Sequence, residues 1–376
     1  MKRKKIYTGL IFIVSLSLIL ATYTVISKPN KKIGQKNKII VSKIEKLEKE
    51  CVLDQNCLTD LLIKNLREKG LDNTLILLKE VEENYKDKVS CHDLSHKVGE
   101  QAYNLYPKES LNLRDPICSS GLEHGILTSA TDTLDERSYI DFLTSYCESE
   151  TDGLKTGCIH GLGHVFKQKN LDKKKASEIC RDVAKELYKT SNLKDDILMK
   201  SKIDFEGNCF DGYVMEEVRD KTDLIFEDYK KYCSGLLGAS KEFCIFEYQR
   251  TYANKTKKLN DKEIALLKIK KYCLEVENTQ LRVSCAFSLG EAISENISGE
   301  YKLSSGQDNP NQKNKFIKKI DTHCQGDELF IESCLDGVLS KASNYKITNK
   351  DELVNICQAI RFKKYIDYCK SSIPYL

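Results

Sequence analysis

The sequence predicts an all-α protein: a right-handed α-solenoid of disulfide-stapled helical hairpins, about seven units long, behind an N-terminal transmembrane helix. Three observations support this prediction. Proline is rare, with 5 in 376 residues, and no alternating strand pattern bounded by hairpin turns occurs. Sixteen cysteines all follow one apolar N-terminal run. Cysteine pairs then recur at similar spacing to the end of the chain, which is typical of a helical repeat.

Residues 1–27 are predicted to form an uncleaved signal anchor. Four basic residues, Lys2 to Lys5, precede an uncharged and largely apolar run over residues 6–26. That run can cross a hydrocarbon core of about 30 Å as a helix. A cleaved signal peptide usually has a shorter run that ends in small residues, and Ala21 offers only a poor cleavage site. We therefore expect a single-pass protein of the cell membrane, attached through this helix, or a secreted protein if the segment is cleaved.

The body of the protein is predicted to lie on the extracytoplasmic side. Residues 28–45, rich in lysine and asparagine, are expected to be a flexible spacer, and residues 46–376 a cysteine-rich helical-repeat domain. Disulfides persist outside the cytosol, whereas sixteen free thiols would be a liability there. Zinc-thiolate binding is disfavoured because the sequence contains no CxxC pair.

Each unit is predicted to be a helical hairpin with two helices, A and B. One cysteine lies near the end of helix A and the other at the start of helix B, where the two ends of an antiparallel hairpin are neighbours. Spacing does not by itself establish which cysteines pair. The assignment of sequence neighbours is Cys51 with Cys57, Cys91 with Cys118, Cys147 with Cys158, Cys180 with Cys209, Cys233 with Cys244, Cys273 with Cys285, Cys324 with Cys334, and Cys357 with Cys369.

Five of the six histidines occur within residues 91–166, in three variants of one motif. The variants are Cys91-His-Asp-Leu-Ser-His96, Cys118-Ser-Ser-Gly-Leu-Glu-His124 and Cys158-Ile-His-Gly-Leu-Gly-His164. Aligning the B helices makes His96, His124 and His164 equivalent, and the later units have Met215, Glu291 and Ser340 at that place. A residue needed for packing would recur in every repeat. The histidines therefore indicate a functional site on the first three B helices.

A transition metal is the predicted ligand of this site. Histidines in the first turn of a helix feel the positive end of its dipole, which lowers their pKa and favours the neutral, metal-binding imidazole. Two neighbouring helices could share one ion, whereas three would need tight curvature or two ions. Zinc, copper(II) and iron all suit such ligands. The predicted ligands are His92, His96, His124, His160 and His164, with Asp93, Glu100, Glu123 and Glu216 as supporting carboxylates.

Small residues recur at the fourth position of each B segment, counted from its cysteine. Close approach of neighbouring helices explains a glycine at such a place. We assign this role to Gly121, Gly161, Gly212 and Gly337. At Gly125 and Gly163, which flank histidines, room for a ligand is an equally good explanation.

Three other interpretations of the histidines stay open. Haem could lie between two histidines, although no CxxCH attachment motif is present. An anion or phosphate could bind at the helix N-termini, with the histidines as donors or as general acid and base. The histidines could also only cap and pack the helix starts.

Two function classes follow. The first is a membrane-anchored, extracytoplasmic metal-binding protein, either a metallo-enzyme or a carrier. The second is a metal-free, disulfide-stapled scaffold that binds a protein or peptide partner on its surface. A formal net charge of only +4 gives no basic patch for nucleic acid. No HExxH, GxSxG, P-loop or dinucleotide motif is present, so the sequence names no reaction.

Overall fold

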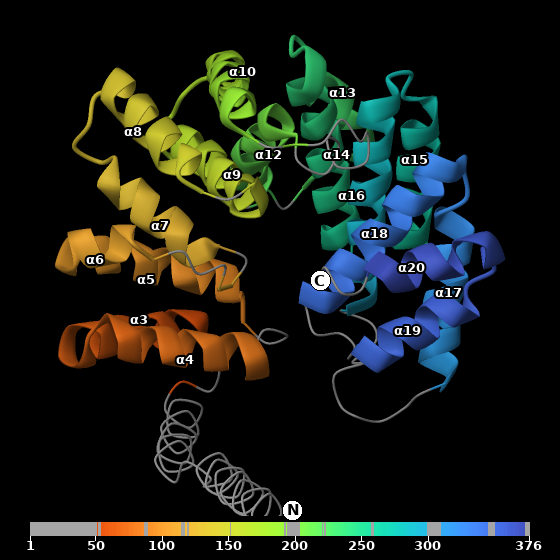
Figure 1. Cartoon of the computed structure of the whole chain (residues 1–376), viewed down its shortest axis with the longest axis horizontal. Helices are drawn as coiled ribbons and strands as arrows, with labels where there is room; N and C mark the ends of the chain where they lie inside the picture. Colours follow the sequence, from red (N-terminus) through yellow and green to blue (C-terminus); the bar gives the residue numbers. More distant parts are fainter. Residues whose placement is uncertain are drawn as a thin grey trace, which may run out of the picture. The chain divides into compact units, whose positions relative to one another are not determined.

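The computed structural model describes most of the chain beyond its first fifty residues (Figure 1). It describes residue 51 and residues 54–372, except 86–88, 114–116, 119, 151, 192, 194–203, 220, 222, 257–258, 299–309 and 345–349. Residues 54–376 belong to one compact unit. The predicted anchor, residues 1–27, and the predicted spacer, residues 28–45, lie outside the described residues. Among the described helices, none combines the length and the apolar composition that a membrane crossing requires.

The predicted all-α class is confirmed, because the described residues contain helices and no strand. The helices of the first half are α3 (Gln55–Lys69), α4 (Leu71–Asn84), α5 (Cys91–Leu105), α6 (Pro107–Leu111), α7 (Gly121–Ala130), α8 (Glu136–Glu148), α9 (Asp152–Gln168) and α10 (Lys173–Thr190). Those of the second half are α12 (Phe205–Val218), α13 (Tyr229–Tyr232), α14 (Gly238–Lys255), α15 (Leu259–Glu275), α16 (Thr279–Ser298), α17 (Pro310–His323), α18 (Glu328–Asn344), α19 (Lys350–Ala359) and α20 (Ile366–Ser372). The right-handed solenoid itself stays a prediction.

Seven disulfides join sequence-neighbour cysteines, as predicted. They link Cys91 to Cys118, Cys147 to Cys158, Cys180 to Cys209, Cys233 to Cys244, Cys273 to Cys285, Cys324 to Cys334, and Cys357 to Cys369. Their Cα–Cα distances of 5.2 to 5.9 Å are ordinary for disulfides. Cys51 and Cys57 are disulfide-bonded as well. So many disulfides are typical of a secreted or extracytoplasmic protein.

The expectation that the second cysteine of each pair begins a helix is wrong for most units. Helix α9 begins at Asp152, six residues before Cys158, and α16 and α18 likewise begin six residues before their cysteines. The reason is an earlier helix cap. The side chains of Asn278 and Asp327 accept hydrogen bonds from backbone N–H groups of the first turns of α16 and α18. The cysteines therefore lie in the second turn of these helices.

Three pairs of helices cross at glycines where their backbones touch. In each pair, a Cβ on either glycine would clash with the carbonyl oxygen three residues before the partner glycine. The residues that precede one glycine face the residues that precede its partner glycine, so the two helices of each pair run parallel. Since no side chain separates the two main chains, the separation is the closest that helices can have. The crossings are Gly99 with Gly125 (α5 and α7), Gly163 with Gly212 (α9 and α12), and Gly290 with Gly337 (α16 and α18).

These crossings revise the predicted roles of the glycines. Close helix approach is confirmed at Gly121, Gly212 and Gly337, where an added Cβ would meet a neighbouring backbone. Gly125 and Gly163 have the same packing role and do not leave space for a ligand. Gly161, by contrast, makes room for a histidine, because its Cβ would lie 2.6 Å from Cδ2 of His124.

Helix α14 is an exception to the glycine pattern. It packs against α12 and α16, between the second and third glycine pairs. Counted from its cysteine, the position of Gly212 and Gly337 is occupied in α14 by Glu247, a buried carboxylate. A buried charge needs partners, and Glu247 pairs with Arg250 and accepts a hydrogen bond from Thr251. Tight backbone contact is thus replaced by a polar interior at this point of the array.

Candidate metal centre

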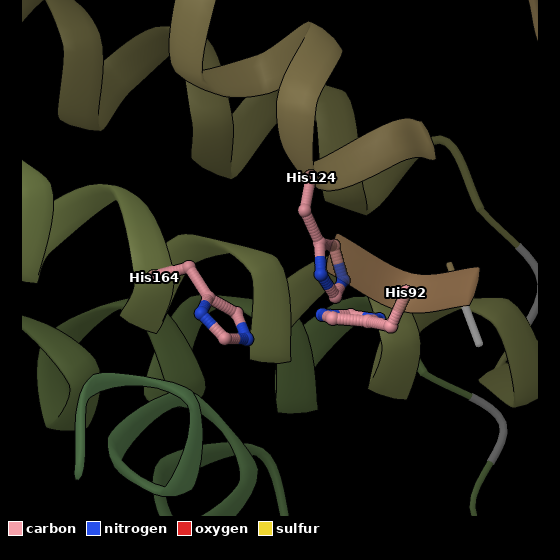
Figure 2. Close-up of side chains that lie close together, drawn as sticks. All are labelled: His92, His124 and His164. Carbon is pink, nitrogen blue, oxygen red and sulfur yellow. The ribbon is translucent and has the colours of Figure 1, made fainter. Parts of the chain in front are cut away.

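Three histidines from three helices converge in the interior. His92 comes from α5, His124 from α7 and His164 from α9, and one ring nitrogen of each lies within 4.8 Å of the others. Figure 2 shows the three rings close together. The glycine crossing of α5 and α7 brings the first two helices into contact, and α7 in turn contacts α9.

All five predicted histidines belong to this cluster. Neighbouring ring centroids are 4.9 to 5.8 Å apart. Within α9, the Nε2 atoms of His160 and His164 are 3.1 Å apart. The expected difficulty of joining three helices does not arise, because the backbone contact between α5 and α7 removes one side-chain layer. The predicted alignment of the repeats, however, was shifted by one helical turn. The crossings make His96 equivalent to His160, because each lies three residues before the crossing glycine of its helix.

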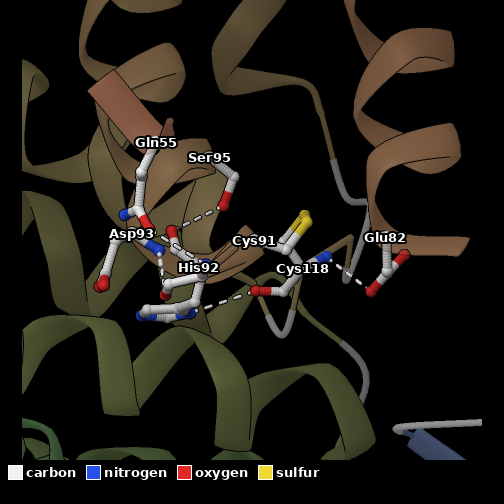
Figure 3. Close-up of a disulfide and its surroundings, with 8 residues drawn as sticks. Gln55, Glu82, Cys91, His92, Asp93, Ser95 and Cys118 are labelled. Carbon is white, nitrogen blue, oxygen red and sulfur yellow. Dashed lines mark hydrogen bonds between the residues drawn. A yellow bond between two sulfur atoms is a disulfide. The ribbon is translucent and has the colours of Figure 1, made fainter. Parts of the chain in front are cut away.

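Hydrogen bonds fix which nitrogen of each converging ring carries a proton. His92 Nδ1 lies 3.1 Å from the Cys118 carbonyl oxygen. Figure 3 draws this hydrogen bond as a dashed line. His124 Nε2 lies 3.2 Å from the Gly157 carbonyl oxygen, and His164 Nδ1 lies 2.9 Å from a Glu216 carboxylate oxygen. Carbonyl and carboxylate oxygens only accept, so each of these nitrogens donates. The opposite nitrogen of each ring therefore has a lone pair, and at His164 this lone pair accepts from Nε2 of His160, 3.1 Å away.

Buried ring nitrogens without a hydrogen bond occur at His124 and His96. Nδ1 of His124 and Nε2 of His96 have no hydrogen-bond partner among the described residues. A buried polar atom left in this way costs about 1–3 kcal/mol unless something else binds it. An electron-pair acceptor such as a metal ion would remove that cost at His124.

Four of the five clustered histidines are held neutral. Burial, and next the neighbouring histidines, lower the pKa of His96, His124 and His164 well below the usual value, and burial lowers that of His160 to about 3. The helix dipole is not the cause at His160 and His164, which lie more than two turns into α9. Neutral imidazole is the form that binds metals, although the reason differs from the one predicted.

Of the predicted carboxylates, Glu216 contacts a histidine. Besides His164 it contacts Gln168 and Arg219. Asp93 pairs with Arg219 and Glu100 with Lys97.

Glu123 is buried in α7. Asp211 was missed: its Oδ2 lies 3.5 Å from Nδ1 of His160. It directly precedes Gly212 as His124 precedes Gly125, so aligning the crossing glycines would have found it.

The Cys91–Cys118 disulfide adjoins the cluster. It joins the start of α5 to the segment before α7, and the Cys118 carbonyl is the acceptor that orients His92 (Figure 3). The Cys118 N–H donates to Glu82 of α4 at 2.8 Å. One covalent link and one hydrogen bond therefore hold the group that orients this ring. His323, the sixth histidine, lies elsewhere and contacts Glu263 at 2.7 Å.

Two cavities border the histidines on different sides. One, of about 300 Å³, is lined in part by His92 and His160. The other, of about 430 Å³, is lined in part by His96 and Glu216. Small solutes can thus reach the cluster.

No protein-family model matches the chain, and the search of curated proteins found no similar sequence. What the protein does is therefore inferred from the site itself.

The neutral histidines predict a loss of stability in acid. Above pH 6.5 they are neutral in both the folded and unfolded states and contribute no pH dependence. Below it, the unfolded chain takes up protons that the folded protein does not, down to a pH of about 3 at His160. The free energy of unfolding should fall by up to about 1.4 kcal/mol per pH unit for each histidine. Urea unfolding of the metal-free protein between about pH 7.5 and about pH 5 measures this. A midpoint that does not change with pH would contradict it.

Proposed function

We propose that the chain is a membrane-anchored, extracytoplasmic protein that binds a transition-metal ion through His92, His124 and His164. One observation carries the proposal: three imidazoles from three helices bring ring nitrogens to within 4.8 Å of one another. Each ring is oriented by an oxygen acceptor on its other nitrogen, which is how proteins prepare histidine for a metal.

The ligand geometry suits a tetrahedral ion after a small adjustment. Zinc–nitrogen bonds of about 2.0–2.1 Å place two ligands of a tetrahedron roughly 3.4 Å apart. Ring rotations that bring the nitrogens closer by up to about 1.4 Å would form such a site. Three protein ligands leave a fourth position. If water takes it, the centre has the composition of a catalytic site, whereas His160, beside His164, could close it as in a carrier.

Two carboxylates adjoin the histidines and could balance the charge of a bound ion. Neutral imidazoles bring no negative charge of their own, so the ion's charge must be balanced by neighbours. Glu216 contacts His164 and Asp211 lies near His160, one on each side of the α9 histidines. Zinc, copper(II) and iron all accept nitrogen ligands with outer carboxylates, so the identity of the metal has to be measured.

Metal analysis of the purified full-length protein tests the proposal. We expect about one equivalent of zinc, copper or iron, removable by a chelator and restored by titration. The variant His323→Ala is the matched control, because it removes a histidine outside the cluster and should keep the full equivalent. Protein that is metal-free as isolated and binds none of the three ions would overturn the proposal.

The other interpretations have less support. The ring centroids of neighbouring histidines are 4.9 to 5.8 Å apart, which leaves no space for a porphyrin between the rings. Packing alone does not explain the buried, unbonded Nδ1 of His124. A metal-free scaffold for a protein or peptide partner stays a prediction, which metal-free protein would favour.

A further inference from the structure

Four of the five clustered histidines form a tetrahedron of rings. The six separations between their ring centroids all lie between 5.0 and 5.8 Å. Four points in one plane cannot have six nearly equal separations, so the rings occupy the corners of a nearly regular tetrahedron. The four are His92, His96, His124 and His164.

The size of this tetrahedron fits one metal ion at its centre. Edges of about 5.4 Å place the centre about 3.3 Å from each corner. A zinc ion that is bound by a ring nitrogen at about 2.0–2.1 Å lies about 3.2 Å from the centroid of that ring. The positions of all four rings therefore suit a single ion, and only their orientations have to adjust by rotation about side-chain bonds.

His96 has three properties that a fourth ligand requires. It lies one helical turn after His92 on α5, which is the spacing at which two histidines of one helix bind one zinc ion. Its carbonyl oxygen lies at the contact with α7, where a Cβ on Gly125 would clash with it, so its backbone is fixed against that helix. Its Nε2 is buried without a hydrogen-bond partner among the described residues, and a bond to an ion would satisfy this atom.

His160, the fifth histidine, has other partners. Its Nε2 lies 3.1 Å from Nε2 of His164, and its Nδ1 lies 3.5 Å from Oδ2 of Asp211. When an ion takes the lone pair of His164, His160 has to release that nitrogen, and Asp211 remains as its neighbour. His160 therefore competes with the ion for His164, whereas His96 does not.

We propose that His96 is the fourth ligand of this metal centre, which is itself proposed from three histidines, and that four imidazoles close the coordination shell of the ion. A closed tetrahedral shell is typical of sites that retain an ion, whereas a hydrolytic centre keeps one position for water. The ion is therefore held or carried by the protein, and no substrate binds to it.

Azide binding to the cobalt-substituted full-length protein tests the closed shell. Cobalt(II) accepts the same nitrogen ligands as zinc, and its visible absorption changes when a ligand is added or exchanged. Cavities of about 300 and 430 Å³ border the cluster, so azide can reach the ion. We expect the native protein to show the spectrum of a tetrahedral ion and to keep that spectrum when azide is added. A saturable change of the native spectrum would show an exchangeable position and overturn the proposal.

Removal of His96 is expected to open the shell. His96→Ala should still bind cobalt through the three remaining imidazoles, and azide should now change its spectrum and saturate at one azide per ion. Added imidazole should fill the vacant position and abolish this response. If His96→Ala does not fold, the azide titration of the native protein decides by itself.

Two further variants complete the comparison. His160→Ala distinguishes the rival ligand: if this variant responds to azide and His96→Ala does not, His160 is the fourth ligand and the assignment of His96 is wrong. His323→Ala is the matched control and should keep the native spectrum, because His323 contacts Glu263 outside the cluster. Absence of cobalt binding in every sample would refute the metal centre itself, whereas bound cobalt that takes up azide in the native protein would refute only the closed shell.

Discussion

The double substitution of His124→Ala and His164→Ala is expected to reduce bound metal from about one equivalent to about none, with the helical circular dichroism retained. Two of the three converging nitrogens are removed, and the third cannot hold an ion against water. The disulfides and glycine crossings do not depend on these rings, so the fold should persist. Elemental analysis after dialysis against a weak chelator measures the effect.

A second variant tests the orientation of the His164 ring without removing a metal ligand. Glu216→Gln keeps every ring but replaces the carboxylate that accepts from Nδ1 of His164. Loss of such an outer partner usually lowers metal affinity about 10- to 100-fold without changing stoichiometry. A double variant that keeps a full equivalent, or a Glu216→Gln variant with the affinity of the native protein, would show that the ion is held elsewhere.

Gly163→Ala is expected to cost about 3 kcal/mol of the free energy of unfolding. A Cβ there would clash with the Cys209 carbonyl oxygen and come within 2.5 Å of the Tyr213 nitrogen. Both atoms are backbone, so relief requires α9 and α12 to separate over their whole crossing. Helix propensity favours alanine over glycine by only about 1 kcal/mol. The clash outweighs this gain, so the substitution is expected to destabilise the fold.

Gly157→Ala in the same helix is the matched control. Its Cβ would meet only the Ser120 side chain, with Oγ at 3.1 Å, and a side chain can move. We expect its stability to lie within about 1 kcal/mol of the native protein. Urea unfolding with the disulfides intact compares the two variants. Equal stabilities would show that the α9–α12 contact is looser than described.

The sequence alone predicted the chemistry of the chain better than its packing. Pairing of the cysteines followed from spacing, because neighbours along a hairpin are neighbours in space. Convergence of the histidines followed from their repeated motif.

The starts of the helices could not be predicted from the cysteines. The capping residues Asn278 and Asp327 mark the starts of α16 and α18, and the cysteines come later in these helices. Asp211 was missed because its relation to His160 exists only across the contact of two helices. The roles of Gly161 and Gly163 were exchanged for the same reason, since both glycines occur in one motif and only the partner helix distinguishes them.

The crossing of Gly99 and Gly125 has a consequence for how this protein can change over evolutionary time. Where two main chains touch, their separation is set by atoms that every residue shares and not by the sizes of core side chains. Leucine, isoleucine and valine elsewhere in the interior can therefore be exchanged without moving His92, His96 and His124 relative to one another. Descendants of a common ancestor could lose nearly all overall identity and still keep the same centre, recognisable by a few glycines, cysteines and histidines at fixed intervals.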